Sequence, residues 1–294
     1  MSVSRSRVAT ISALGMLAAG ALTTVTATSA DAASTTPTIK VFVTKGHDVR
    51  MTTHMRPGVH RFAVRSGKSA AFQIAQARPG YTKAELSRDV NAGLNADQAN
   101  LKALKRFERN VTLLGGVPSK PGERGMLFVD LPAGRYFAVD TNAHVQKASK
   151  ILTVRVGGNR LAGAMPRATA TIRAIHEADW APDPKTIATR GMLRFTNASE
   201  DNHFIDIAPL APGKTMKDFT AWMDKVKKGE NAGPPPVDEQ SKMLDTGAVS
   251  PGRTMTMRYS LPQGDYVMLC WWPDAEMGGM PHAFMGMYRG IKIR

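Results

Sequence analysis

A cysteine, two histidines and a methionine in the C-terminal part of the chain form a set that can hold a metal ion. Cys270 ends an apolar segment, and His203 opens another such segment upstream. His282 and Met287 follow downstream, with four residues between them. Thiolate, imidazole and thioether are the soft donors that favour copper in an electron-transfer site. Cys270 is the only cysteine of the 294 residues, so the chain forms no internal disulfide.

The N-terminus predicts an export signal over residues 1–32. Arg5 and Arg7 precede an apolar stretch at about 8–27, and the small residues around Asp31 suit cleavage before Ala33. No later segment has the roughly 18 unbroken apolar residues of a membrane span. We therefore expect a secreted, extracytoplasmic protein with no membrane span after the signal is cleaved.

The charge of the chain is strongly positive. Its formal net charge is +15 at pH 7, and removal of the leader, with two arginines and one aspartate, leaves +14. The basic residues are scattered, and no nucleic-acid-binding motif accompanies them. Such a field favours an acidic redox partner protein or an anionic cell-wall surface, although a basic secreted protein without a dedicated anionic ligand has the same composition.

The sequence repeats itself, which predicts two domains. A shift of 133 positions aligns residues 38–40 with 171–173, 61–62 with 194–195, and 79–82 with 212–215. A shift of 130 then aligns LPAGRY at 131–136 with LPQGDY at 261–266. We expect domains at 38–156 and 169–294, joined by a Gly- and Ala-rich linker at 157–168.

Both repeats consist mainly of short alternating segments, which predict strands. Each repeat also has one segment of helical periodicity after its Pro-Gly, at about 83–107 and 216–227. The pattern predicts an all-β chain of two tandem Greek-key β-sandwiches, each with a helical insertion.

The second repeat resembles a cupredoxin domain. Phe195-Thr196-Asn197 followed by His203 is similar to the segment that carries the first copper histidine. The segment 261–270 (LPQGDYVMLC) is similar to the strand that delivers the copper cysteine, and His282-x4-Met287 to the second histidine and axial methionine. The resemblance implies one copper ion held by His203, Cys270 and His282, with Met287 as a weak axial ligand.

The first repeat lacks most of this set. The same alignment places Ala70 opposite His203 and Asp140 opposite Cys270. Counted back from the last strand, His144 lies opposite His282, and Ser149 lies opposite Met287. We expect no copper site of this kind in the first repeat, which resembles the same fold only through the repeat.

Several alternatives remain for these residues. Cys270 could be an inert core thiol, Met285 competes with Met287, and the methionines of this region could be flexible core filler. The chain would then be a metal-free binding or structural module. A copper oxidase or nitrite-reductase-like enzyme is less favoured, because its additional copper is usually held by His-x-His pairs and this sequence has none.

The leading hypothesis is a secreted cupredoxin-like protein for electron transfer or copper handling. It requires the sulfur of Cys270 and ring nitrogens of His203 and His282 to lie within about 4 Å of one another, because metal–ligand bonds are ~2 Å long.

Overall fold

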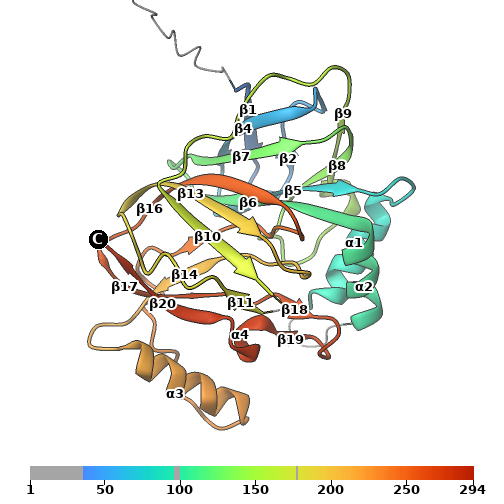
Figure 1. Cartoon of the computed structure of the whole chain (residues 1–294). Helices are drawn as coiled ribbons and strands as arrows, with labels where there is room; N and C mark the ends of the chain where they lie inside the picture. Colours follow the sequence, from blue (N-terminus) through green and yellow to red (C-terminus); the bar gives the residue numbers. More distant parts are fainter. Residues whose placement is uncertain (1–35, 96–99, 177) are drawn as a thin grey trace, which may run out of the picture. The chain divides into compact units, whose positions relative to one another are not determined.

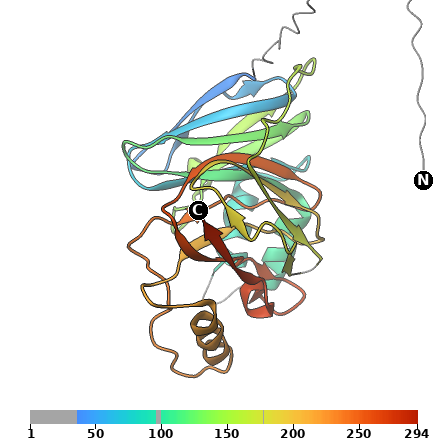
Figure 2. The same cartoon turned by 60° about the vertical axis from the view of Figure 1, so that its left-hand side comes forward.

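The computed structural model describes residues 36–95, 100–176 and 178–294, whose arrangement is shown in Figures 1 and 2. The predicted leader at 1–32 lies outside the described residues. Strands dominate the described part, and the predicted all-β fold class is confirmed. None of the described helices has the length and apolar character needed to cross a membrane.

The largest sheet contains strands from both repeats. Antiparallel pairing of β16 with β7, such as Met255 with Val129, joins the strands of the second repeat to those of the first. The two repeats therefore share one sheet, which the sequence pattern did not predict. In spatial order its strands are β11 (Asp179–Trp180), β10 (Ala170–Ile175), β13 (Arg190–Asn197), β16 (Thr254–Ser260), β7 (Gly125–Leu131), β4 (Gly58–Ser66), β1 (Thr38–Val43) and β2 (Val49–Arg50).

Each repeat also contributes a five-stranded sheet of its own. In the first repeat the order is β3 (His54–Met55), β9 (Leu152–Val156), β8 (Gly134–Asp140), β5 (Ala70–Ala77) and β6 (Val111–Ser119). In the second repeat it is β12 (Thr186–Ile187), β20 (Tyr288–Ile293), β17 (Gly264–Leu269), β14 (Asp206–Pro209) and β15 (Leu244–Asp245). A separate hairpin joins β18 (Pro273–Asp274) and β19 (Met280–Pro281).

Equivalent strands of the two repeats pair in the same register. Thr38 of β1 lies opposite Arg61 of β4, and Thr171 of β10 lies opposite Arg194 of β13, a constant shift of 133 positions. The Leu-Pro-x-Gly-x-Tyr turns also match, because Tyr136 and Tyr266 each donate a hydroxyl hydrogen bond to the carbonyl four residues earlier, at 2.6 and 2.9 Å. This is the pattern that a duplicated unit would produce.

Alternation of buried and exposed residues explains how the sheets pack. In β10 alternate residues are buried, as expected when one face of a strand covers a core. The apolar faces of the three large sheets contribute to one buried cluster, which includes Phe62 and Phe72 in the first repeat and Phe195 and Ile207 in the second. This continuous core fixes the strand ends that carry the candidate ligands.

The helical insertions differ between the repeats. In the second repeat α3 (Met216–Lys227) spans the predicted range, and a capping box between Thr215 and Asp218 starts it. The prediction of one helix over 83–107 in the first repeat is wrong, because two helices form, α1 (Lys83–Gly93) and α2 (Leu101–Asn110).

The burial of leucines from both helices in one core explains why a single helix does not form. Leu86 and Leu104 lie in the same core, whereas a single straight helix would separate them by about 27 Å. Gly93 permits the close approach of the two helices, since a Cβ there would lie 2.6 Å from the Leu104 nitrogen. Two short helical elements remain, a 3-10 turn at Ala148–Lys150 and α4 (His282–Met285).

Candidate metal centre

Strand register brings the three candidate ligands to one edge of the second repeat. Asp206 of β14 pairs with Leu269 of β17, so the start of one strand lies beside the end of the other. His203 precedes Asp206 by three residues and Cys270 directly follows Leu269. The chain then returns through the β18–β19 hairpin to His282. The backbone amide of the next residue, Ala283, donates to the Cys270 carbonyl at 2.7 Å. This last bond holds the start of α4 against the end of β17.

The donor atoms of these residues face one another. Sγ of Cys270 lies 3.7 Å from Nδ1 of His203 and 3.8 Å from Nδ1 of His282, and the two Nδ1 atoms are 3.0 Å apart. All three residues are fully buried. A trigonal site with metal–nitrogen bonds of ~2.0 Å and a metal–sulfur bond of ~2.3 Å would separate its donors by about 3.5–3.7 Å. The two sulfur–nitrogen distances match this range, the nitrogen–nitrogen distance of 3.0 Å is about 0.5 Å shorter, and all three fall within the expected 4 Å.

A hydrogen-bond chain sets the tautomer of His203. Nε2 of His203 lies 2.7 Å from Oγ of Ser199, and that hydroxyl donates to Oδ1 of Asn197 at 2.7 Å. Because the single hydroxyl hydrogen is used in this way, Ser199 accepts from Nε2–H, which leaves the lone pair of Nδ1 free to face Cys270. The Asn197 amide donates to the carbonyls of Asp201 and Val249 at 2.6 and 2.7 Å, which fixes the chain.

Two carboxylates lie near His282. A ring nitrogen of His282 and one oxygen each of Asp201 and Asp274 lie within 4.8 Å of one another. Nε2 of His282 is buried and has no hydrogen-bond partner among the described residues. Oδ1 of Asp274 accepts from the amides of Glu276 and Met277 at 2.7 and 3.0 Å. Carboxylates in such places commonly orient metal-binding histidines.

Burial controls the protonation of the donors. It raises the pKa of the Cys270 thiol to about 12. Burial, followed by the neighbouring imidazole, lowers the pKa of His203 to about 3. Burial also lowers the pKa of His282 to about 4, although the charge of Asp274 opposes this. Both imidazoles are therefore neutral at pH 7, and the thiol releases its proton only to a cation that takes its place.

Met287 and Met285 have different surroundings. Met287 is fully buried in the cluster that contains Cys270, whereas Met285 is half-buried in α4. The Met287 amide donates to the carbonyl of His282 at 3.0 Å, and its carbonyl accepts from the Cys270 amide at 3.2 Å. Its carbonyl also accepts from Nε1 of Trp180 at 3.3 Å. The main chain of Met287 is thus tied to two candidate ligands, and Met287 stays our prediction for the axial position.

Trp272 covers the thiol and connects it to the first repeat. Its backbone N–H donates to Sγ of Cys270 at 3.5 Å, and its indole N–H donates to Glu108 in α2 at 2.9 Å. The indole also stacks on Phe107, with ring centroids 6.2 Å apart. The link between Trp272 and α2 had no sequence signal.

In the first repeat a carboxylate takes the place of the thiol. Asp140 ends β8 and pairs with Phe72, one position beyond the pair that is equivalent to Asp206 and Leu269 of the second repeat. Its buried side chain accepts from the Ala71 amide at 2.8 Å and lies 2.6 Å from Nδ1 of His47. The equivalent strand end is thus tied by hydrogen bonds from its own neighbours.

Sequence reasoning missed the residues that support the ligands. The sequence pattern placed Asn197 only in the segment before His203, and it predicted no supporting role for Ser199, Asp201 or Asp274. The spacing of Ser199 four residues before His203 is the one signal that could have indicated a partner for the imidazole.

Comparisons with known proteins concern the fold. No family model matches the chain, and no curated protein matches it. Solved structures of auracyanins are similar to part of the chain. Reduced auracyanin from the photosynthetic bacterium Roseiflexus castenholzii is 21% identical with a TM-score of 0.27, and the match covers 42% of this chain and 95% of that chain.

Two further auracyanins match in a similar way. Auracyanin B is 15% identical with a TM-score of 0.27, over 47% of this chain and 96% of that chain. Auracyanin A, a "blue" copper protein from the green thermophilic photosynthetic bacterium Chloroflexus aurantiacus, is 12% identical with a TM-score of 0.26, over 42% of this chain and 96% of that chain. These matches have low TM-scores and cover less than half of this chain.

Proposed function

We propose that this chain is a copper protein that works outside the cytoplasm in electron transfer or copper handling. His203, Cys270 and His282 would hold one copper ion, with Met287 as the axial ligand. The observation that carries the proposal is a buried thiol facing two neutral imidazole nitrogens at 3.7 and 3.8 Å. When bound, copper would supply the uptake and release of one electron.

The surrounding residues suit this task. Ser199 fixes the imidazole of His203, and the backbone N–H of Trp272 supports the sulfur. Since the three ligands belong to a continuous β core, they can keep one geometry in both charge states of the site. Full burial also limits the access of water to the thiolate.

The metal-free alternative explains the site less well. An inert core thiol requires only apolar neighbours, whereas this sulfur lies against two fully buried imidazoles whose Nδ1 atoms are 3.0 Å apart. Burial of polar groups is costly unless they find partners. A shared cation would satisfy all three donors at once, which supports the metal-binding proposal.

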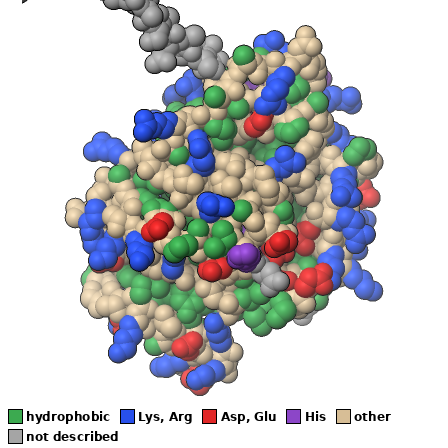
Figure 3. All heavy atoms as spheres, in the orientation of Figure 1, with side chains coloured by type: hydrophobic (Ala, Val, Ile, Leu, Met, Phe, Trp, Pro, Cys, Tyr) green, Lys and Arg blue, Asp and Glu red, His purple; other side chains and the backbone are tan. Residues whose placement is uncertain are grey.

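The distribution of charge bears on the partner. Lysine and arginine side chains are spread over the face drawn in Figure 3 and do not gather into one patch, in keeping with a formal net charge of +15. The proposal therefore includes docking to an acidic redox partner or an anionic cell-wall surface through a diffuse field.

A copper titration tests the proposed function. The purified protein with Cu(II) should show strong thiolate-to-copper absorption near ~600 nm that saturates at one equivalent. Cys270→Ser should remove the band while the protein stays folded. His60, another buried histidine, provides the matched control, because His60→Asn should leave the band unchanged. A folded protein that stays colourless with excess Cu(II) would support the metal-free module.

A further inference from the structure

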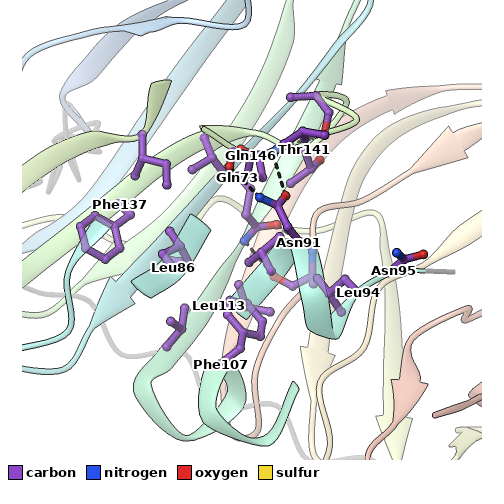
Figure 4. Close-up of a pocket in the computed structure, with 18 of the residues that line it drawn as sticks. Gln73, Leu86, Asn91, Leu94, Asn95, Phe107, Leu113, Phe137, Thr141 and Gln146 are labelled. Carbon is purple, nitrogen blue, oxygen red and sulfur yellow. Dashed lines mark hydrogen bonds between the residues drawn. The ribbon is translucent and has the colours of Figure 1, made fainter. Parts of the chain in front are cut away.

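A cavity of about 490 Å³ lies between the two helices of the first repeat and its five-stranded sheet. Figure 4 shows Leu86 of α1, Phe107 of α2, and Leu113 and Phe137 of the sheet among the side chains that line this space. Alternation along β5 explains the walls, because Phe72 and Ile74 enter the core between the sheets while Gln73 and Ala75 line the cavity. Its volume is in the range of small-molecule sites.

The second repeat packs the equivalent layer differently. The outer face of its sheet carries Ala208 and Val267, and α3 covers them with Phe219 and Met223 to form a separate buried cluster. The register makes Ala208, opposite Val267, the equivalent of Ala75, opposite Phe137. The same layer of the fold is thus filled by aromatic and thioether side chains in one repeat and leaves a cavity in the other.

The lining determines which ligands the cavity suits. The described residues that line it include no Asp, Glu, Lys or Arg, and His144 is their one titratable side chain. The amide of Gln73 is used within the protein, accepting from the Ala248 amide at 2.9 Å and donating to the Ala248 carbonyl at 3.1 Å. A charged ligand would lose its hydration without gaining a counter-ion, whereas apolar surface gains from transfer out of water.

A loop at the mouth of the cavity is held to α1 by hydrogen bonds, which form a tether. Asn91 of α1 and Gln146 exchange two hydrogen bonds, at 2.8 and 2.9 Å, drawn in Figure 4. Next to this tether Val145 exposes 59% of its surface at the rim. The tether holds the rim in place, and the apolar valine continues the lining outward.

The cavity also reaches the candidate metal centre. Trp272 lines it and stacks on Phe107, another lining residue. The backbone N–H of the same tryptophan donates to Sγ of Cys270 at 3.5 Å. A flat ring in the cavity would therefore contact the pair of Phe107 and Trp272, and Trp272 lies two residues after Cys270 and donates a hydrogen bond to its sulfur.

We propose that this cavity is a binding site for a neutral, mostly apolar ring compound next to the candidate copper centre. The site does not depend on bound copper, so the metal-free full chain tests it separately from the proposed function. Two fluorescent probes with the same ring skeleton serve as ligands, neutral N-phenyl-1-naphthylamine and anionic 1-anilinonaphthalene-8-sulfonate. The neutral probe should bind at one equivalent and at least about tenfold more tightly, because the described lining offers no lysine or arginine to the sulfonate.

Equivalent alanines provide matched variants. Ala75→Phe should fill the cavity, weaken the neutral probe by more than about tenfold and leave Tm within about 2 °C of the parent protein. Ala208→Phe, at the equivalent but packed position, should lower Tm and leave probe affinity unchanged in the folded fraction. Ala143→Trp at the rim supplies a second cavity variant if Ala75→Phe fails to fold.

The outcomes decide the proposal. Equal or tighter binding of the anionic probe would show attraction to the basic surface and overturn it. Unchanged binding of the neutral probe to folded Ala75→Phe or Ala143→Trp would place the probe elsewhere and overturn it as well.

Discussion

Replacing Ser199 by alanine tests how the candidate copper centre is prepared. In the parent protein Ser199 accepts from Nε2–H of His203 and passes its own hydrogen to Asn197. Without the hydroxyl, Nε2 of a fully buried ring loses its acceptor, and the tautomer with hydrogen on Nδ1 is no longer disfavoured. Because hydrogen on Nδ1 blocks a metal bond, Ser199→Ala should weaken copper binding.

The Ser199→Ala change should lower both the folding stability and the copper affinity. A buried donor that loses its partner costs about 1–3 kcal/mol of folding stability. Loss of a group that orients a metal ligand typically lowers metal affinity by about 10–100-fold, which corresponds to about 1.4–2.7 kcal/mol. Competition between the protein and a copper chelator, followed by the absorption band, measures the affinity, and urea unfolding of the metal-free protein measures the stability.

Ser250 supplies a matched control. Ser199 and Ser250 are both 6% exposed, and the Ser250 hydroxyl accepts from the Leu113 amide at 2.8 Å and donates to Oδ1 of Asn202 at 2.5 Å, so it makes no hydrogen bond to a candidate ligand side chain. Ser250→Ala should lower stability and leave copper affinity unchanged, whereas Ser199→Thr, which keeps the hydroxyl, should restore most of the affinity. A folded Ser199→Ala protein with copper affinity within about twofold of the parent protein would refute the assigned role of the hydrogen bond.

Three other changes have expected outcomes. Asp274→Asn keeps the Oδ1 that accepts the two loop amides but removes the charge near His282, so copper affinity should fall by about tenfold in the same competition assay; unchanged affinity would exclude this influence. Trp272→Phe removes the indole hydrogen bond to Glu108, which should lower the free energy of unfolding by about 1 kcal/mol in urea, and an unchanged midpoint would contradict it. Burial lowers the pKa of His60 in the folded protein, so His60 binds a proton more readily in the unfolded chain. The free energy of unfolding should therefore fall as pH drops below about 6.5. His60→Asn should reduce that fall in thermal unfolding between pH 7 and 5. An identical pH profile in the variant would show that His60 is not responsible.

The sequence predicted the elements that run along the chain better than the contacts between distant segments. Alternation identified the strands, and the apolar strand ending at Cys270 indicated where the thiol would lie. The placement of His203 and His282 beside it followed from the resemblance, and the structure brings the three side chains together. The export signal falls on residues that the structure does not describe.

Features that depend on tertiary packing had no local signal. The pairing of β16 with β7 joins segments more than a hundred residues apart, and periodicity reports only which face of a strand is buried. The break between α1 and α2 follows from the return of the chain over the sheet, since helical spacing alone continues through Gly93. The contribution of Ser199 depends on an imidazole turned toward it, which a turn-forming sequence does not specify.

X-ray absorption at the copper edge of the loaded protein tests the central claim most directly, because it reports the atoms bonded to the metal. The account predicts one sulfur at ~2.1–2.3 Å and two imidazole nitrogens at ~2.0 Å, with loss of the short sulfur distance in Cys270→Ser. A first shell of nitrogen and oxygen alone in the parent protein, unaffected by Cys270→Ser, would contradict it.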